Sequence, residues 1–374
     1  MSLSTLPAVL LQLVMHGLCT SEIVSLAKSH RQMIQAACSP FAWKYERAAV
    51  LFPGVNVQML ATAPMLRHPE LRLTLRSFSG RGTEEDAAES FFTFGSCSSF
   101  LASMPPSIRI GALVVDVQIA HPQWLTLLSS PSLQLLRELR VNEQFTRQLQ
   151  MNAAMIDTLA ALPRLDTLHV GSVLSFWANM DKLKSLTSLA FIDNRRPPES
   201  LMLRVAWLPL KHLGVRKPAL TDEDFIDFFS APRMNALESL RLEDVSGMSA
   251  ATPSTGFNQV CRAMTQLRRV ELVNFALVEY LLPEMVHAAS LKFVLIEPNL
   301  DPNVHEFTQT CPKPETIVAL LNSKSKLELH VVLRVQETWL DECVQQSYME
   351  QLRVLFAEDA RLTGLGERFK LRVV

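Results

Sequence analysis

A six-residue pattern, Leu-x-x-Leu-x-aliphatic, recurs along the chain and constrains its fold more than any other feature. It appears as LRELRV from Leu136, LDTLHV from Leu165, LTSLAF from Leu186, LKHLGV from Leu210, LESLRL from Leu237, LRRVEL from Leu267 and LKFVLI from Leu291. The steps between these starts are 29, 21, 24, 27, 30 and 24 residues. Because alternate residues of a strand point to opposite sides, the pattern predicts one short, half-buried strand in each copy.

Repeats of this length are typical of a leucine-rich-repeat solenoid, whose units run ~20–29 residues. One unit cannot bury its strand alone, so stacked neighbours are expected to share a continuous apolar core. The segments between copies favour helices. TDEDFIDFFSA offers Thr221 as an N-cap with Asp224 three residues later, and QMNAAMIDTLAAL and FNQVCRAM have similar compositions. We therefore expect an α/β fold of parallel strands with helical returns.

The segments flanking the seven copies suggest further units. PELRLTLRSF and IRIGALVVDV are expected strands before the first copy, and KLELHVVLRV and FKLRVV are expected after the last. The helix between the latter two would be built on Trp339, Leu340, Val344, Met349, Leu352 and Leu355. The asparagine often found just past such strands occurs only as Asn194 and Asn299, so we expect uneven turns. The predicted organisation is a helical module at 1–53, a linker or irregular repeat at 54–107 with a mobile loop at 79–90, the solenoid at 108–312 and capping repeats at 313–374.

The segment Thr5–Cys19, TLPAVLLQLVMHGLC, contains no Asp, Glu, Lys or Arg. It is a poor secretory signal because the first lysine, Lys28, follows it. It is also shorter than the ~20 apolar residues of a membrane-spanning helix. Apolar spacing predicts three short helices in the first part of the chain, the third including Val50. Such small helices bury little area, so we expect a partner or neighbouring domain to cover them.

The order of residues in this module resembles the F-box family. The residues that carry the resemblance are Leu6, Pro7, Leu10, Val14, Leu18, Leu26, Ala27, Trp43 and Lys44. The resemblance implies that the helices bind a Skp-type adaptor of a cullin-RING ubiquitin ligase. The implied adaptor-binding residues are Leu6, Pro7, Leu10, Leu11, Val14, Leu18, Ile23, Leu26 and Trp43. The chain would then be the substrate-recognition subunit of an SCF-type (Skp-cullin-F-box) ligase.

A second interpretation is a leucine-rich-repeat scaffold, or a structural subunit of a larger assembly, with no role in ubiquitin transfer. The segment Leu6–Leu26 would then pack on the first repeat. In either case, outward residues of the repeats are the expected contacts to another protein. These candidates are Arg137, Arg140, His169, Lys211, His212, Glu238, Arg241, Arg268, Glu271 and Lys292. Their mixture of acids and bases favours a protein surface as the partner.

Composition argues against several other functions. The chain has 36 basic and 37 acidic residues, so it lacks the basic excess of nucleic-acid-binding proteins. Its six cysteines form no C-x-x-C pair and no glycosylation sequon occurs, which favours reduced, mostly buried thiols in the cytoplasm or nucleus. No phosphate-binding loop, metalloprotease motif or nucleophile elbow is present. We therefore expect no enzyme activity, no cofactor, no metal site and no membrane partner.

Overall fold

The chain divides into two compact units, Met1–Ser185 and Leu186–Val374. The computed structural model describes residues 48–51, 71–76, 110–116, 121–141, 152–172, 180–192, 205–218, 221–245, 254–275, 278–298, 312–323, 328–335, 347–348, 350–351, 354 and 368–373. Within these ranges no helix has the length and apolar character needed to cross a membrane.

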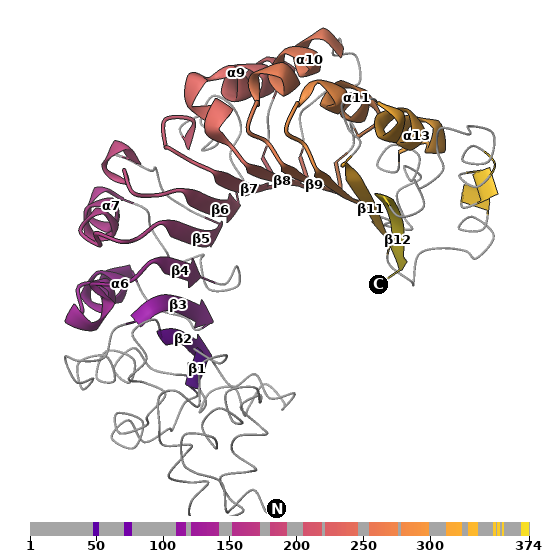
Figure 1. Cartoon of the computed structure of the whole chain (residues 1–374). Helices are drawn as coiled ribbons and strands as arrows, with labels where there is room; N and C mark the ends of the chain where they lie inside the picture. Colours follow the sequence, from indigo (N-terminus) through magenta and orange to yellow (C-terminus); the bar gives the residue numbers. More distant parts are fainter. Residues whose placement is uncertain are drawn as a thin grey trace, which may run out of the picture. The chain divides into compact units, whose positions relative to one another are not determined.

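The first unit is built from parallel strands paired in chain order (Figure 1). They are β1 (Ala48–Leu51), β2 (Leu71–Arg76), β3 (Ile110–Asp116), β4 (Glu138–Val141) and β5 (Thr167–Ser172). The helices α6 (His121–Leu128) and α7 (Ala153–Ala160) precede β4 and β5 and lie against each other. The 3-10 turns Pro131–Leu133 and Met180–Lys182 complete the returns. The strands expected in PELRLTLRSF and IRIGALVVDV are thus confirmed.

The second unit repeats the same arrangement with parallel strands in chain order. Its strands are β6 (Ser188–Ile192), β7 (His212–Arg216), β8 (Ser239–Glu243), β9 (Arg269–Val273), β10 (Phe293–Glu297), β11 (His330–Val335) and β12 (Phe369–Val373). The helices α9 (Asp222–Ser230), α10 (Ser254–Ala263), α11 (Val278–Glu284) and α13 (Pro314–Asn322) lie on one side of these strands (Figure 1). The 3-10 turns Pro232–Ala236 and Met285–His287 follow α9 and α11. The expected α/β fold of parallel strands with helical returns is confirmed for the described residues.

Every copy of the six-residue motif forms a strand that starts two residues after its first leucine. In β8, Leu240 and Leu242 are buried, whereas Ser239, Arg241 and Glu243 are half-buried on the other face. The first leucine of each copy is buried as well. Full burial of such a side chain contributes roughly 1.5–3 kcal/mol, so each repeated leucine stabilises the fold.

The helix α9 shows how a return is fixed by its own sequence. Thr221 Oγ1 accepts the backbone N–H of Asp224, and the Asp224 carboxylate accepts the N–H of Thr221, which completes the predicted capping box. Phe225, Phe228 and Phe229 point into the core, with ring centroids 4.6 Å apart for Phe225 and Phe229 and 4.8 Å apart for Phe228 and Phe229.

A residue with left-handed backbone conformation directly follows each of three successive strands of the second unit. Lys217, Asp244 and Asn274 have φ values of 55°, 55° and 48°. Their N–H groups donate to carbonyls of the following repeat, at 2.7 Å to Glu243, 3.0 Å to Val273 and 2.7 Å to Glu297. The expected turn asparagines, Asn194 and Asn299, lie outside the described residues. At the matching position after β7 and β9 the chain has Pro218 and Phe275, both buried, so the turn residue is one position earlier than expected.

The N-terminal boundary requires one correction. The third expected helix included Val50, but Ala48–Leu51 is strand β1 and pairs in parallel with Arg72–Leu75 of β2. A four-residue apolar run has no periodicity of its own, and pairing with β2 satisfies its backbone groups as a strand. The rest of the expected three-helix module, residues 1–47 and 52–53, lies outside the described residues.

The strands also extend past the expected limits of the solenoid. β2 lies within 54–107, and β11 and β12 lie within 313–374 and pair in the same parallel order. The expected loop at 79–90 lies outside the described residues. So do all six residues expected to build the C-terminal helix, Trp339, Leu340, Val344, Met349, Leu352 and Leu355.

Candidate functional site

The open face of the second unit's sheet, defined by Ser239, Arg241 and Glu243 of β8 and their register partners, carries a chain of ion pairs. Arg241 of β8 pairs in register with Glu271 of β9, and its Nη1 lies 2.8 Å from Glu271 Oε2. Because both side chains leave the same face of adjacent strands, the register itself brings them together.

Further residues extend this pair in both directions. Glu243 accepts from Arg241 at 3.0 Å and from Arg216 of β7 at 2.9 Å. Glu271 also accepts from Arg269 at 2.7 Å. We refer to Arg216, Glu243, Arg241, Glu271 and Arg269 as the face network. It crosses three strands, and each of its carboxylates is shared by two arginines.

The face network ends against an apolar region at β10. The guanidinium carbon of Arg269 lies 4.2 Å from the centroid of the Phe293 ring, a cation–π geometry. Leu295 and Val332, which continue the row of Glu271 on β10 and β11, are buried. This face therefore carries apolar side chains at Leu295 and Val332 beside one further ion pair, in which Arg334 Nη1 of β11 lies 3.2 Å from Glu297 Oε2 of β10.

The electrostatics of the network keep its groups charged. Burial raises the pKa of Glu271, but hydrogen bonds from Arg269 and Arg241 outweigh it and hold that pKa below its usual value. Burial lowers the pKa of Arg241, but hydrogen bonds to Glu243 and Glu271 outweigh it and leave that pKa raised. The arginine and glutamate side chains thus stabilise each other's ionised forms.

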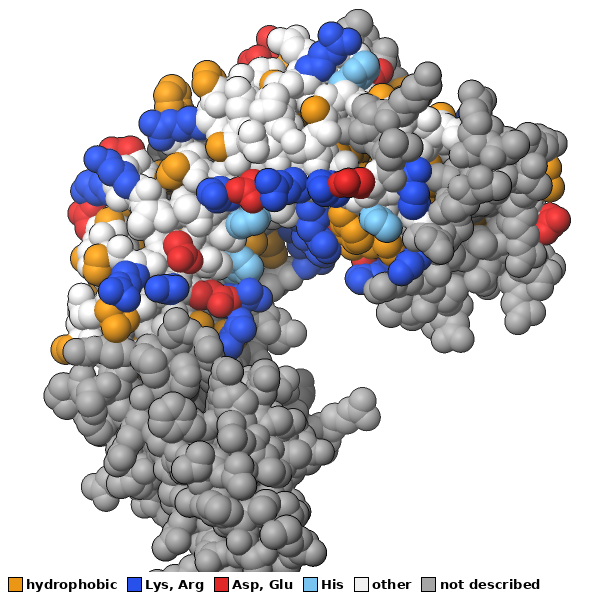
Figure 2. All heavy atoms as spheres, in the orientation of Figure 1, with side chains coloured by type: hydrophobic (Ala, Val, Ile, Leu, Met, Phe, Trp, Pro, Cys, Tyr) orange, Lys and Arg blue, Asp and Glu red, His pale blue; other side chains and the backbone are white. Residues whose placement is uncertain are grey.

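A second row of charges lies just before the strands. This edge row consists of Lys211, Glu238, Arg268 and Lys292, each of which directly precedes a strand. Lys211 lies 3.0 Å from Glu238, and Lys292 lies 2.6 Å from Glu328. The hydrogen bond from Lys211 lowers the pKa of Glu238. Figure 2 shows basic and acidic side chains side by side in a row across this unit.

The backbone explains why the edge row is so regular. The carbonyl of Lys211 accepts the N–H groups of Glu238 and Ser239, and the carbonyl of Glu238 accepts those of Arg268 and Arg269. The carbonyl of Arg268 accepts from Lys292 and Phe293 in the same way. The residue just before each of these strands is therefore held at an equivalent position, and before β7, β8, β9 and β10 that residue is charged.

The first unit has a smaller group of the same kind. Arg72 of β2 lies 3.0 Å from Glu138 of β4, and Arg140 contacts the same carboxylate. His169 of β5 pairs in register with Arg140. Burial, and then the charge of Arg140, lower the pKa of His169 to about 4, so this imidazole is neutral near pH 7.

The structure separates the predicted target-binding residues into two sets. Arg140, His169, Arg241 and Glu271 lie within strands as expected, and the exposed His212 is the first residue of β7. The other candidates directly precede their strands: Arg137, Lys211, Glu238, Arg268 and Lys292. The predicted adaptor-binding residues Leu6, Pro7, Leu10, Leu11, Val14, Leu18, Ile23, Leu26 and Trp43 lie outside the described residues.

Three members of the face network were not among the candidates. Arg216 and Glu243 occupy the residue after the motif, because strands β7 and β8 run one position past the last aliphatic. Arg269 is the residue after the candidate Arg268 and is the first of β9. Strict alternation within the motif would have found Arg269, and extending it by one residue past the last aliphatic would have found Arg216 and Glu243.

Few residues in the described ranges could bind a metal ion or supply a thiol. No group of three or more His, Cys, Asp and Glu side chains there could hold a metal ion. Cys261 of α10 is buried, and the cysteines at 19, 38, 97, 311 and 343 lie outside those ranges.

No protein-family model and no curated protein sequence matches the chain.

Proposed function

We propose that the chain is a protein-binding repeat protein whose open sheet face contacts a target protein. Support comes from the face network, which presents arginines that are fixed in position and still accessible. The side chains of Arg241 and Arg269 are 43% and 47% exposed, although each is bound to at least one glutamate. Arginine is enriched in the residues that dominate binding energy at protein interfaces.

The arrangement of the charges suits a specific contact. A guanidinium has five N–H donors, so pairing with Glu243 and Glu271 leaves Arg241 able to donate to a partner. Because the glutamates already hold the arginines in place, little side-chain entropy is lost on binding. An alternating pattern of charge also selects a partner of complementary pattern.

We further propose that this binding serves an SCF-type ubiquitin ligase, with the chain as its substrate-recognition subunit. The support is the resemblance of the N-terminal residues, among them Leu6, Pro7 and Leu10, to the F-box family. A receptor of this kind needs no catalytic residue. It acts by raising the effective concentration of the target's lysines near the ubiquitin carrier.

The ligase proposal is tested by mixing the purified chain with a Skp-type adaptor and measuring the mass of the complex by light scattering. We expect a complex of one chain with one adaptor. Leu10→Asp, and separately Pro7→Ala combined with Leu11→Asp, are expected to abolish it without changing the melting temperature of the repeats. Glu328→Gln, at an exposed ion pair of the second unit, is the control that should bind normally. Failure of the intact chain to bind the adaptor would refute the ligase role.

One observation favours the alternative, a repeat scaffold with no ligase role. Strand β1 lies within the segment assigned to the helical module, yet it pairs with β2 as part of the sheet. A module that continues directly into the sheet suits N-terminal helices that cap the first repeat. Under this alternative the open face remains the binding surface and the adaptor does not bind.

A further inference from the structure

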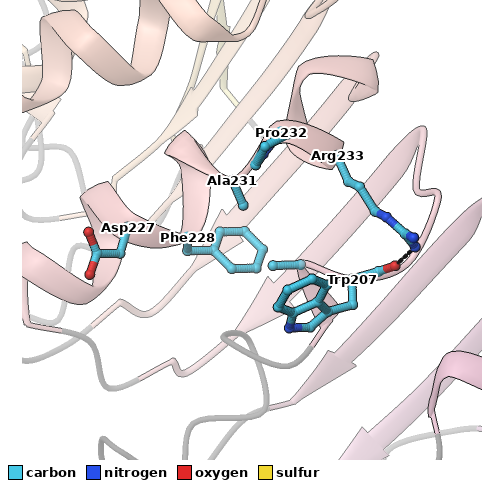
Figure 3. Close-up of a pocket in the computed structure, with 7 residues that line it drawn as sticks. Trp207, Asp227, Phe228, Ala231, Pro232 and Arg233 are labelled. Carbon is cyan, nitrogen blue, oxygen red and sulfur yellow. Dashed lines mark hydrogen bonds between the residues drawn. The ribbon is translucent and has the colours of Figure 1, made fainter.

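A pocket on the helix side of the second unit is separate from the open face. It has a volume of about 330 Å³ and lies between the segment before β7 and the end of α9 (Figure 3). Its lining residues are Ala206, Trp207, Asp227, Phe228, Ala231, Pro232 and Arg233. This volume is at the lower end of the roughly 300–1,000 Å³ typical of ligand pockets, which suits one bulky side chain.

The most unusual member of the pocket is Trp207. Trp207 is 69% exposed, whereas Phe228 beside it is 2% exposed. Figure 3 shows the indole and the Phe228 ring on the same side of the α9 backbone. The Arg233 guanidinium donates to the Trp207 carbonyl, which ties the 3-10 turn to this segment. The indole is thus presented from a fixed backbone, as tryptophans at binding hot spots are.

The charges at the two ends of the pocket differ in sign. Asp227 is exposed on α9, and Figure 3 shows its carboxylate at the opposite end from Arg233. Asp227 is the acid among the lining residues, and α9 contains no lysine or arginine, so this end of the pocket is acidic. Asp224 is already used in the capping box, which leaves Asp227 as the pocket's own acid.

We propose that this pocket binds a peptide segment that inserts one bulky apolar side chain against Trp207 and Phe228. The segment places a basic side chain beside Asp227 and an acidic side chain beside Arg233. This choice of partner follows from charge complementarity at the two ends of an apolar site. The site is independent of the open face and of any adaptor, so it holds whether or not the ligase role does.

The test uses the full chain labelled with 5-fluorotryptophan and observed by fluorine NMR. The five tryptophans are Trp43, Trp124, Trp177, Trp207 and Trp339, and Trp207→Phe identifies the resonance of interest. The probe is the peptide acetyl-Lys-Leu-Glu-amide, which is expected to shift the Trp207 resonance saturably. Acetyl-Lys-Gly-Glu-amide, which lacks the apolar side chain, is expected to leave it unchanged.

The charge requirement is tested with acetyl-Glu-Leu-Glu-amide. We expect it to bind roughly twofold to fivefold more weakly than the Lys-Leu-Glu peptide, as an exposed ion pair allows. Asp227→Lys is expected to reverse this order of affinities. Equal affinities in both proteins would overturn the assignment of Asp227.

Filling the pocket provides an independent check. Ala231→Leu places extra atoms in it and is expected to abolish the shift, whereas Ala236→Leu, at an exposed residue of the 3-10 turn that follows, should preserve binding. Absence of any saturable shift in the intact protein would overturn the proposal. So would a Trp207 resonance that moves with protein concentration alone, because that result would assign the pocket to self-association.

Discussion

Glu271 is the residue on which the face network depends most. Its side chain is only 15% exposed and accepts from Arg241 at 2.8 Å and from Arg269 at 2.7 Å. Glu271→Gln removes the charge and leaves two arginines side by side. We expect a loss of about 1 kcal/mol in the free energy of unfolding, measured by urea denaturation, since partly exposed pairs contribute less than buried ones.

The matched control for this substitution is Glu328→Gln. Glu328 pairs with Lys292 at 2.6 Å, but its side chain is 75% exposed. We expect no measurable change in the urea midpoint. Equal losses for both variants would mean that the network adds nothing beyond ordinary surface pairs.

His169 provides a test of electrostatics in the first unit. Its pKa is lowered from 6.5 to about 4, first by burial and then by Arg140, while Glu138 opposes the shift. The unfolded chain therefore binds more protons than the folded one between these two values. Stability should rise with pH across this window and level off above it.

The measurement is an NMR titration of the His169 ring protons. Arg140→Gln is expected to raise the His169 pKa only in part, because burial remains the larger cause. A pKa near 6.5 in the intact protein would show that the imidazole is solvated and that His169 is not buried on this face.

At the scale of single elements, the capping box decides where α9 begins. Thr221→Ala removes the side-chain acceptor for the Asp224 N–H and is expected to cost about 1 kcal/mol of stability. Asp224→Ala removes the reciprocal bond. The double variant should lose less than the sum of the two, since both bonds belong to one motif. The control is Glu223→Ala, at an exposed residue of the same helix, which should change the stability little. If the stability losses of Thr221→Ala and Asp224→Ala were strictly additive, the two bonds would not act as one capping box.

The left-handed turns allow a comparison between two equivalent positions. Lys217 and Asp244 both have φ of 55°, a region that costs an ordinary residue roughly 1–2 kcal/mol. Asp244 also binds Arg216 at 3.4 Å and Asn274 at 2.7 Å. Lys217→Gly should therefore raise the melting temperature, whereas Asp244→Gly should not, because relief of strain is offset by the lost bonds. A gain at both positions would mean that the Asp244 contacts contribute nothing.

At the scale of the whole molecule, the strands were the most predictable feature. Each copy of the motif encodes a strand locally, because leucines at fixed spacing must be buried and no other period fits them. The capping box of α9 was equally local. Strand β1 was not predicted, because AAVL shows no hydrophobic periodicity and forms a strand only by pairing with β2.

The site was less predictable, because it depends on register and packing. Arg241 and Glu271 were recognised as outward residues, but their partners Arg216 and Glu243 lie where the strands outrun the motif. The pocket at Trp207 could not be foreseen at all. It forms only when the segment before β7 meets the end of α9, and nothing in either segment's own sequence specifies that contact.

The most direct test of the central claim is site-specific photocrosslinking in cells that express the chain. A photoreactive amino acid at Ser239 samples the open face of β8, and one at the exposed Ala319 samples α13 on the helix side. We predict a discrete crosslink to another protein from position 239 that disappears when Arg241 is replaced by glutamate, and none from position 319. Equal crosslinking from both positions, or none from position 239, would contradict the assignment of the open face as the binding surface.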